Sequence, residues 1–271
     1  MHCPSCQLRT SSPTLIAQSP SGTYDGAYTG TIGDIGIFSL NFHKVIHCGE
    51  GGLLVTNNDQ YAFRAQLMRN HGEVIMDDLA TQGVSEDIIG SNYRMSELHA
   101  AIAIEQLKKL NRLTDERRAT AAYLTERLQE ISWIIPCHVP NNVKHVYYIY
   151  PFRMLEEKLG VSRKTVVAAL KAEGFPIAAG FQKPLYLFPM YQKKKMFPHS
   201  QFPFVSTEYP SHVSYEKGIC PVAERMYEKE ICHTVIFQPP NGKAEVDGLI
   251  DTLKRIEQNV DALKEYEASA S

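Results

Sequence analysis

Apolar and polar residues follow two different periods along the chain, and these periods predict alternating strands and helices. Residues 60–69 and the longer stretch from Ser96 to Leu128 show the spacing of amphipathic helices. Ser96 is a helix N-cap residue by type, since its hydroxyl can accept a hydrogen bond from an amide of the first turn. Three short apolar runs predict buried strands: residues 14–17, 35–39 and 53–55. Strands alternating with helices are typical of an α/β domain.

The stretch from Ser96 to Leu128 is too long for one typical globular helix. We expect two helices joined near 111–115, or one bent helix, and a junction between domains there. The predicted organisation is a disordered lead over residues 1–13, one domain over 14–113 and a second over 114–271.

The second half changes character and predicts a small α+β domain. Residues 145–153 are aromatic and β-prone, with Pro151 indicating an edge or a bulge. Ser162 caps a helix that stops at Gly174. Three further segments complete this half, namely an irregular stretch at 184–210, a strand at 234–237 and an amphipathic helix from Val246 to Val260.

Composition places the chain among ordinary globular proteins. It has 271 residues, of which 44% are hydrophobic and 21% charged, and its formal net charge is −2. Neither a nucleic acid nor an anionic membrane surface is expected as a partner, because the sequence has no basic excess. No apolar run reaches the length of a bilayer span and no signal-peptide core is evident, so a cytoplasmic location is expected.

The six cysteines do not predict a metal site. Cys3 and Cys6 form a C-x-x-C pair beside His2, but a structural zinc site usually needs a second pair at compatible spacing. The other four cysteines are scattered. We therefore predict no metal and incidental thiols that are reduced in the cytosol.

The densest chemistry lies between Ser39 and Gly52. Lys44 can act as a nucleophile only where its ammonium is partly desolvated or close to other cations, which lowers its pKa. Ser39 can donate its hydroxyl to a phosphate, and the turn Gly49-Glu-Gly-Gly52 lets backbone amides approach one closely. The spacing alone leaves a second interpretation open, in which Lys44 is a solvated surface charge beside an ordinary tight turn.

The flanking motifs favour the first interpretation. Gly33-Asp-Ile-Gly-Ile-Phe-Ser39, Lys44, Gly49-Glu-Gly-Gly52 and Asn92-Tyr-Arg-Met-Ser-Glu97 occur in one order. Together they resemble the pyridoxal-phosphate-dependent sugar aminotransferases of the DegT/DnrJ/EryC1/StrS family, from about Gln18 to the C-terminus. The resemblance implies an α/β fold: part of a large domain of aminotransferase fold type I, followed by a small α+β C-terminal domain.

The resemblance also implies roles for individual residues. Lys44 would carry the Schiff base of pyridoxal 5'-phosphate (PLP) and afterwards shuttle a proton, and Ser39 would bind the cofactor phosphate. Gln18 would contact the ring hydroxyl, and Asn92 would reach the cofactor phosphate of a partner subunit. Arg94 would bind an anionic substrate group; from the residues alone, a salt bridge at a helix start is the simpler reading.

The implied reaction transfers an amino group from an amino acid such as glutamate or glutamine to a keto-sugar nucleotide. The expected assembly is a homodimer, or a heterodimer with a full-length homologue. Some relatives replace the lysine by histidine and are dehydratases. His43 precedes Lys44 here, but the lysine is in its expected place, so aminotransferase is preferred.

Two departures from the family pattern predict impaired activity. The long stretch that precedes these motifs in the family has no counterpart here, which suggests an N-terminally truncated or incomplete member. Leu15 stands where the aspartate that holds the pyridinium nitrogen is expected, which weakens the electron sink. The alternatives are an inactive remnant that binds a sugar nucleotide or a partner protein, and one half of a split enzyme.

Overall fold

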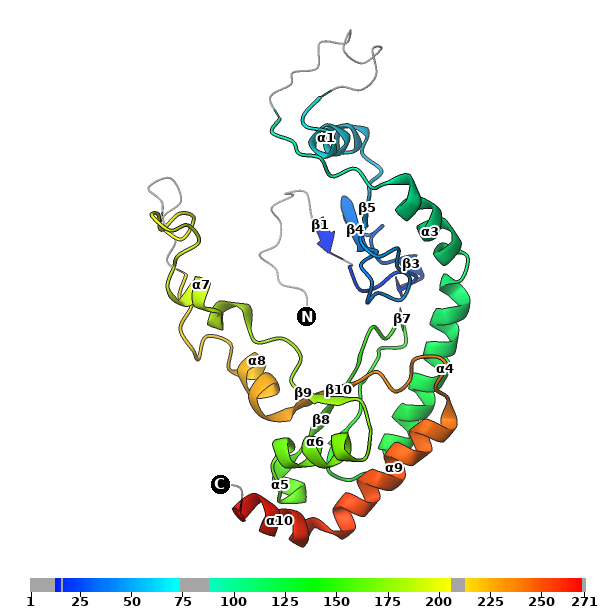
Figure 1. Ribbon diagram of the computed structural model, residues 1–271, viewed down its shortest axis with the longest axis vertical. Coiled ribbons are helices and arrows are strands. Elements are labelled where there is room, and N and C mark those ends of the chain that lie inside the picture. Colours follow the sequence, from blue (N-terminus) through cyan, green and yellow to red (C-terminus); the bar gives the residue numbers. More distant parts are fainter. Residues whose placement is uncertain (1–12, 16, 74–87, 206–212, 270–271) are drawn as a thin grey trace. The chain divides into compact units, whose positions relative to one another are not determined.

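The computed structural model of the chain describes residues 13–15, 17–73, 88–205 and 213–269 (Figure 1). The chain divides into two compact units. The first comprises Met1–Arg118 with Val139–Tyr148, and the second Ala119–His138 with Ile149–Ser271. The expected N-terminal lead up to residue 12 and the Cys3–Cys6 pair lie outside the described residues, as do residues 74–87.

The first unit is built on a three-stranded sheet of order β1-β4-β5. β1 (Pro13–Leu15) runs parallel to β4 (Ile35–Ser39), and β4 pairs antiparallel with β5 (Gly52–Val55). The positions of the three predicted strands are therefore confirmed, although β1 ends at Leu15 and β5 is exposed along its whole length, not buried as expected. A second small sheet, of order β3-β2-β7, was not predicted, and its strands are β2 (Thr23–Tyr24), β3 (Ala27–Tyr28) and β7 (Val143–Lys144).

α3 (Glu97–Leu107) begins where the sequence indicated, and α1 (Asp59–Arg69) begins one residue earlier than the predicted 60–69. α1 is capped by Asn58, whose side chain accepts hydrogen bonds from the first-turn amides. α3 begins after Ser96, whose Oγ accepts from the His99 amide at 3.3 Å. Both helices thus have a polar cap for otherwise unpaired amides.

The helix junction lies earlier than expected. α4 (Leu110–Leu128) follows α3 after two residues, so the expectation of two helices is confirmed, but their junction lies at 108–109 and not at 111–115. Thr114 lies within this continuous helix, where its side chain is fully buried and its Oγ1 donates to the Leu110 carbonyl at 2.7 Å. The boundary between the two units falls inside α4, between Arg118 and Ala119.

The second unit contains an antiparallel sheet of order β6-β8-β10-β9. Its strands are β6 (Ile134–Ile135), β8 (Tyr150–Met154), β9 (Ile177–Ala179) and β10 (Ile231–Thr234). Pro151 is opposite His233 of β10, while β6 reaches only Arg153 and Met154 of β8. Within the described sheet, Pro151 thus has a ladder neighbour on one side, as the edge prediction requires.

Two predicted strand positions in this half are wrong. The strand expected at 145–153 begins only at Tyr150, because Tyr147 adopts a left-handed conformation with φ of 48° that interrupts an extended strand. The strand expected at 234–237 ends at Thr234. There the Ile236 amide donates to Thr234 Oγ1 at 3.1 Å, which turns the chain out of the ladder.

Helices and turns complete the second unit. Ser162 caps α6 (Arg163–Ala172), as predicted, and its Oγ accepts from the Thr165 amide at 3.3 Å. The predicted irregular stretch at 184–210 includes short helical turns, so it is less irregular than expected. The remaining helical elements are α5 (Glu156–Leu159), η1 (Leu185–Leu187), α7 (Pro189–Gln192), α8 (Pro221–Arg225), η2 (Met226–Glu230), α9 (Lys243–Gln258) and α10 (Val260–Ser269).

The core of the second unit is formed where its sheet, α4, α6 and α9 contribute large apolar side chains. Removing such side chains from water provides the main driving force for folding. The largest fully buried ones are Trp133, Tyr150, Phe237, Leu124, Leu128, Ile131, Met154, Leu170, Ile177, Leu249, Ile250 and Leu253. The predicted C-terminal amphipathic helix is confirmed as α9, with α10 following it directly.

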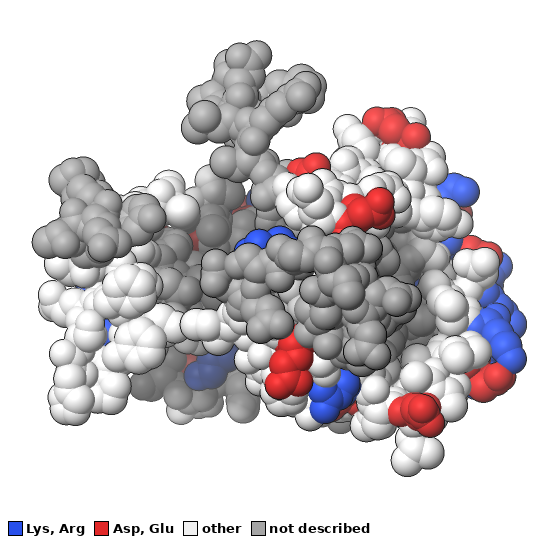
Figure 2. Space-filling view, turned by 90° about the horizontal axis from the view of Figure 1, so that it is seen from above, with Lys and Arg blue, Asp and Glu red and all other residues white. Residues whose placement is uncertain are grey.

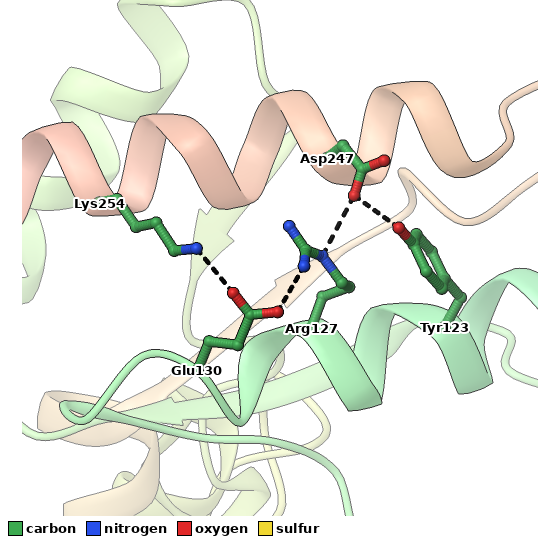
Figure 3. Close-up of polar contacts among 5 residues, drawn as sticks. All are labelled: Tyr123, Arg127, Glu130, Asp247 and Lys254. Atoms are coloured by element: carbon green, nitrogen blue, oxygen red, sulfur yellow. Dashed lines mark hydrogen bonds and ion pairs between the residues drawn. The ribbon is translucent and has the colours of Figure 1, made fainter.

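A chain of polar contacts joins α4 to α9, which run side by side (Figures 1 and 3). Tyr123 Oη donates to Asp247 Oδ1 at 2.7 Å, and Arg127 Nε lies 3.1 Å from the same oxygen. Glu130 forms ion pairs with Arg127 and, at 2.6 Å, with Lys254 Nζ. The network alternates acidic and basic groups, so each charge has an opposite neighbour.

We expect the contribution of Glu130 to stability to depend on pH. The hydrogen bond from Lys254 lowers the pKa of Glu130, so the pair stabilises the fold above the usual carboxyl pKa of about 4.3 and ceases to do so as pH falls through the lower folded value. Glu130→Gln should therefore lower the melting temperature at neutral pH by a few degrees at most, because the site is exposed. Well below the folded pKa, wild type and variant should melt alike. Gln129→Glu, at an exposed neighbouring position, serves as a surface control. An equal difference in melting temperature between wild type and Glu130→Gln at both pH values would contradict the assignment.

Charged side chains are mixed on the face drawn in Figure 2, where small groups of acidic and basic residues alternate with uncharged ones. This agrees with the nearly balanced formal charge. Among the described residues, no helix is both long and apolar enough to cross a membrane.

Candidate functional site

The segment after β4 is anchored by a small hydrophobic cluster beneath it. Leu40, Ile46 and Cys48 are each about 3% exposed and form one buried cluster. The partly buried residues packed against this cluster come from α3, α4 and the segment before α3; they are Met95, Ala103, Leu110 and Leu113. The apolar residues on both sides of Lys44 therefore bind its loop to the helices.

Asn41 organises the backbone of this loop. Its amide donates to Ser39 Oγ at 3.2 Å, and its carbonyl accepts from the Lys44 amide at 2.9 Å. Its side-chain Nδ2 donates to Glu50 Oε1 at 2.6 Å. Ser39, Lys44 and the glycine turn are thus connected through one residue, which sequence reasoning did not single out.

The glycine turn is required by space and by backbone conformation. Gly49 has φ of 90°, a left-handed conformation that residues with a side chain rarely adopt. A Cβ at Gly51 would lie 2.9 Å from Cys48 Sγ and 3.4 Å from Met95 Sδ. The turn therefore packs against the segment that precedes α3, which brings two of the sequence motifs together.

Lys44 is half-buried, and burial lowers the pKa of its ammonium. Its Nζ lies 4.6 Å from the centroid of the Tyr148 ring, which is within the range of a cation–π contact. Lowering the pKa increases the fraction of neutral amine, the form that can attack a carbonyl. The sequence did not predict Tyr148 here, because the aromatic run around it was interpreted as one continuous strand.

The remaining predicted site residues occupy different surroundings. Ser39, at the end of β4, is half-buried and stands on the same loop as Lys44. Gln18 lies in a turn after β1 and is exposed, and its side chain makes no hydrogen bond with the described residues. The structure thus places Ser39 and Lys44 on one loop, whereas no described contact ties Gln18 to it.

Asn92 and Arg94 form a pair beside the end of α1. Asn92 bridges to Asn70, and its Oδ1 accepts from the Arg94 amide at 3.3 Å. The Arg94 guanidinium donates to Asn70 Oδ1, not to a carboxylate, so the salt bridge considered from sequence is absent among the described residues. Both side chains are exposed, which leaves them accessible to a ligand or a second chain.

The donor set of the Lys44 loop fits an aldehyde that also carries a phosphate. The half-buried Lys44 amine suits the aldehyde, and the Ser39 hydroxyl suits a phosphate oxygen. The described residues contain no group of three or more side chains suited to hold a metal ion.

Comparisons with known proteins agree with these features. The profile of the DegT/DnrJ/EryC1/StrS aminotransferase family matches residues 16–235. The L-glutamine:scyllo-inosose aminotransferase of Streptomyces griseus is 30% identical over 254 residues, which cover 90% of this chain and 58% of that protein.

Solved structures show the same fold. An aminotransferase of this family from Brucella abortus superposes with a TM-score of 0.72 at 23% identity, covering 90% of this chain and 57% of that one. The Spr1654 protein of Streptococcus pneumoniae, in its PLP form, gives a TM-score of 0.68 at 21% identity, with 92% and 58% covered. The chain therefore has a partial aminotransferase fold and spans a little over half the length of these proteins.

Proposed function

Because the chain belongs to the DegT/DnrJ/EryC1/StrS aminotransferase family, we propose that it takes part in PLP-dependent transfer of an amino group to a keto-sugar nucleotide. The observation that carries the proposal is Lys44, a half-buried lysine of lowered pKa on a loop fixed from both sides. The name of the Streptomyces griseus relative gives L-glutamine as its amino donor, so glutamate or glutamine is the donor proposed here.

Each residue of the loop has a proposed task. PLP, when bound, supplies an electron sink that stabilises negative charge on the substrate carbon. Lys44 would hold the cofactor covalently through Nζ, and its freed amine would carry a proton to and from the substrate carbon. Ser39 Oγ would donate to the phosphate, and Asn41 keeps the two residues in register through its backbone.

Gln18, Asn92 and Arg94 are proposed at the periphery of the site. Gln18 would contact the cofactor ring hydroxyl. Asn92 would bind the cofactor phosphate of a partner subunit, and Arg94 would bind an anionic group of the substrate through its planar guanidinium. The exposure of all three side chains supports these roles, because none is committed to the interior.

We expect the 271-residue chain to transaminate weakly. The position that the resemblance gives to the pyridinium-binding aspartate is Leu15, and losing one well-placed electrostatic partner costs roughly a hundred- to a thousand-fold in rate. The test adds PLP to the chain, records the absorbance band of bound cofactor, then adds glutamate and follows conversion to the pyridoxamine form. A band with slow conversion is expected, and Lys44→Arg should lack the band.

Three other outcomes are informative. Rapid conversion by the wild-type chain would contradict the expected impairment. A band that survives in Lys44→Arg would contradict the proposed site. Binding of a sugar nucleotide without any cofactor band would support the alternative function, that of an inactive binding protein. The observation that favours this alternative is the leucine at position 15.

The proposed assembly is a homodimer, with a full-length homologue as the alternative partner. α3 has no buried residue, and Leu98 and Ile102, one turn apart on the same face, are exposed at 79% and 49%. Apolar side chains exposed together along one helix are typical of an interface. Asn92 and Arg94 immediately precede this helix, in keeping with roles across a dimer.

Light scattering at micromolar concentration should give the mass of a dimer. Leu98→Asp should shift the chain toward monomer, because a carboxylate would be buried without a partner. Leu185→Asp, at a leucine exposed to 66% in the second unit, is the matched control and should not change the mass. A wild-type monomer at this concentration would contradict the proposed homodimer.

A further inference from the structure

The loop that carries Tyr148 is held in an unusual conformation. Tyr147 has φ of 48°, and its amide donates to His145 Nδ1 at 3.1 Å. Val146 between them is buried, at 3% exposure. A left-handed tyrosine costs conformational free energy, so neighbouring contacts must hold this turn in place.

Two consecutive arginines of α4 provide those contacts. Arg118 Nε donates to the His145 carbonyl at 2.9 Å, and its Nη2 donates to the Ser21 carbonyl at 3.0 Å. Arg117 Nη1 donates to the Tyr147 carbonyl at 3.4 Å. The loop is therefore fixed to α4 on both sides of Val146, directly before Tyr148.

The geometry points to Tyr148 as a positioning residue for Lys44. We propose that its ring face, 4.6 Å from Lys44 Nζ, orients the ammonium and holds its proton. His43, which precedes Lys44 in the chain, also contacts this tyrosine. The centroid of its ring lies 6.0 Å from that of the Tyr148 ring, and the two ring planes are tilted by 53°. The inference rests on the proposed function for the role of Lys44, but the contact between Lys44 and Tyr148 is present in the chain without cofactor.

The ring and the burial act on Lys44 in opposite directions. Burial favours the neutral amine, whereas the negative face of an aromatic ring favours the charged form. A residue that must both attack and carry a proton needs access to both forms, and the ring and the burial act on that balance in opposite senses. The titratable and charged groups on the surrounding elements are His43, Glu50, Arg117, Arg118 and His145, and burial is the resolved cause of the lowered pKa of Lys44.

The test measures how readily Lys44 is acetylated as pH is raised in the cofactor-free 271-residue chain. Mass spectrometry of the Lys44 peptide gives the midpoint of the titration, with the exposed Lys193 as an internal reference. Tyr148→Phe keeps the ring face, and Tyr148→Leu keeps an apolar side chain without it. Tyr148→Leu should lower the Lys44 midpoint by roughly half a unit to one and a half units, and Tyr148→Phe should leave it within about 0.3 units.

An unchanged or raised midpoint in folded Tyr148→Leu would overturn the proposal, because the tyrosine would then act only through burial. An equal fall in Tyr148→Phe would also overturn it, since the hydroxyl would be the active group. Circular dichroism checks folding, and Tyr148→Met replaces the leucine variant if that variant does not fold. No cofactor is added, so failure here leaves the PLP experiments unaffected, and their failure leaves this contact standing.

Discussion

The packing of Leu40, Ile46 and Cys48 is the constraint on which the first unit depends. These buried residues bracket Lys44 in sequence, and they pack against residues of α3 and α4. A lysine between buried anchors cannot extend freely into water, and its pKa is lowered by burial as a consequence. The same apolar contacts that hold the loop thus place its lysine where burial favours the neutral amine.

Hydrogen bonds fix the backbone of the Lys44 loop in addition to the packing of the apolar cluster. Asn41 ties Ser39, Lys44 and Glu50 into one loop through backbone and side-chain hydrogen bonds. Preorganised loops of this kind reduce the entropy lost when a ligand is bound. In the second unit, the network from Tyr123 to Lys254 joins two long helices in an equivalent way, with alternating charges in place of amide groups.

Local rules predicted the elements whose signals are local. Ser96 and Ser162 cap helices because a hydroxyl before an apolar repeat satisfies the first amides, and β4 follows from one apolar run. The turn at Tyr147 was missed, because aromatic residues favour strands and the arginines that hold the turn are distant in sequence. In the candidate site, Lys44 and Ser39 were predicted from their motif, and their roles stay predictions. Tyr148 could not be predicted, since its contact with Lys44 joins segments about a hundred residues apart.

The central claim is that Lys44 is the residue that binds the cofactor covalently. The most direct test incubates the chain with PLP, reduces it with borohydride and maps the labelled peptide by mass spectrometry. The account predicts that the label is on Lys44, that Lys44→Arg abolishes it and that Lys183→Arg does not. A label on another lysine, with Lys44 free, would contradict the account.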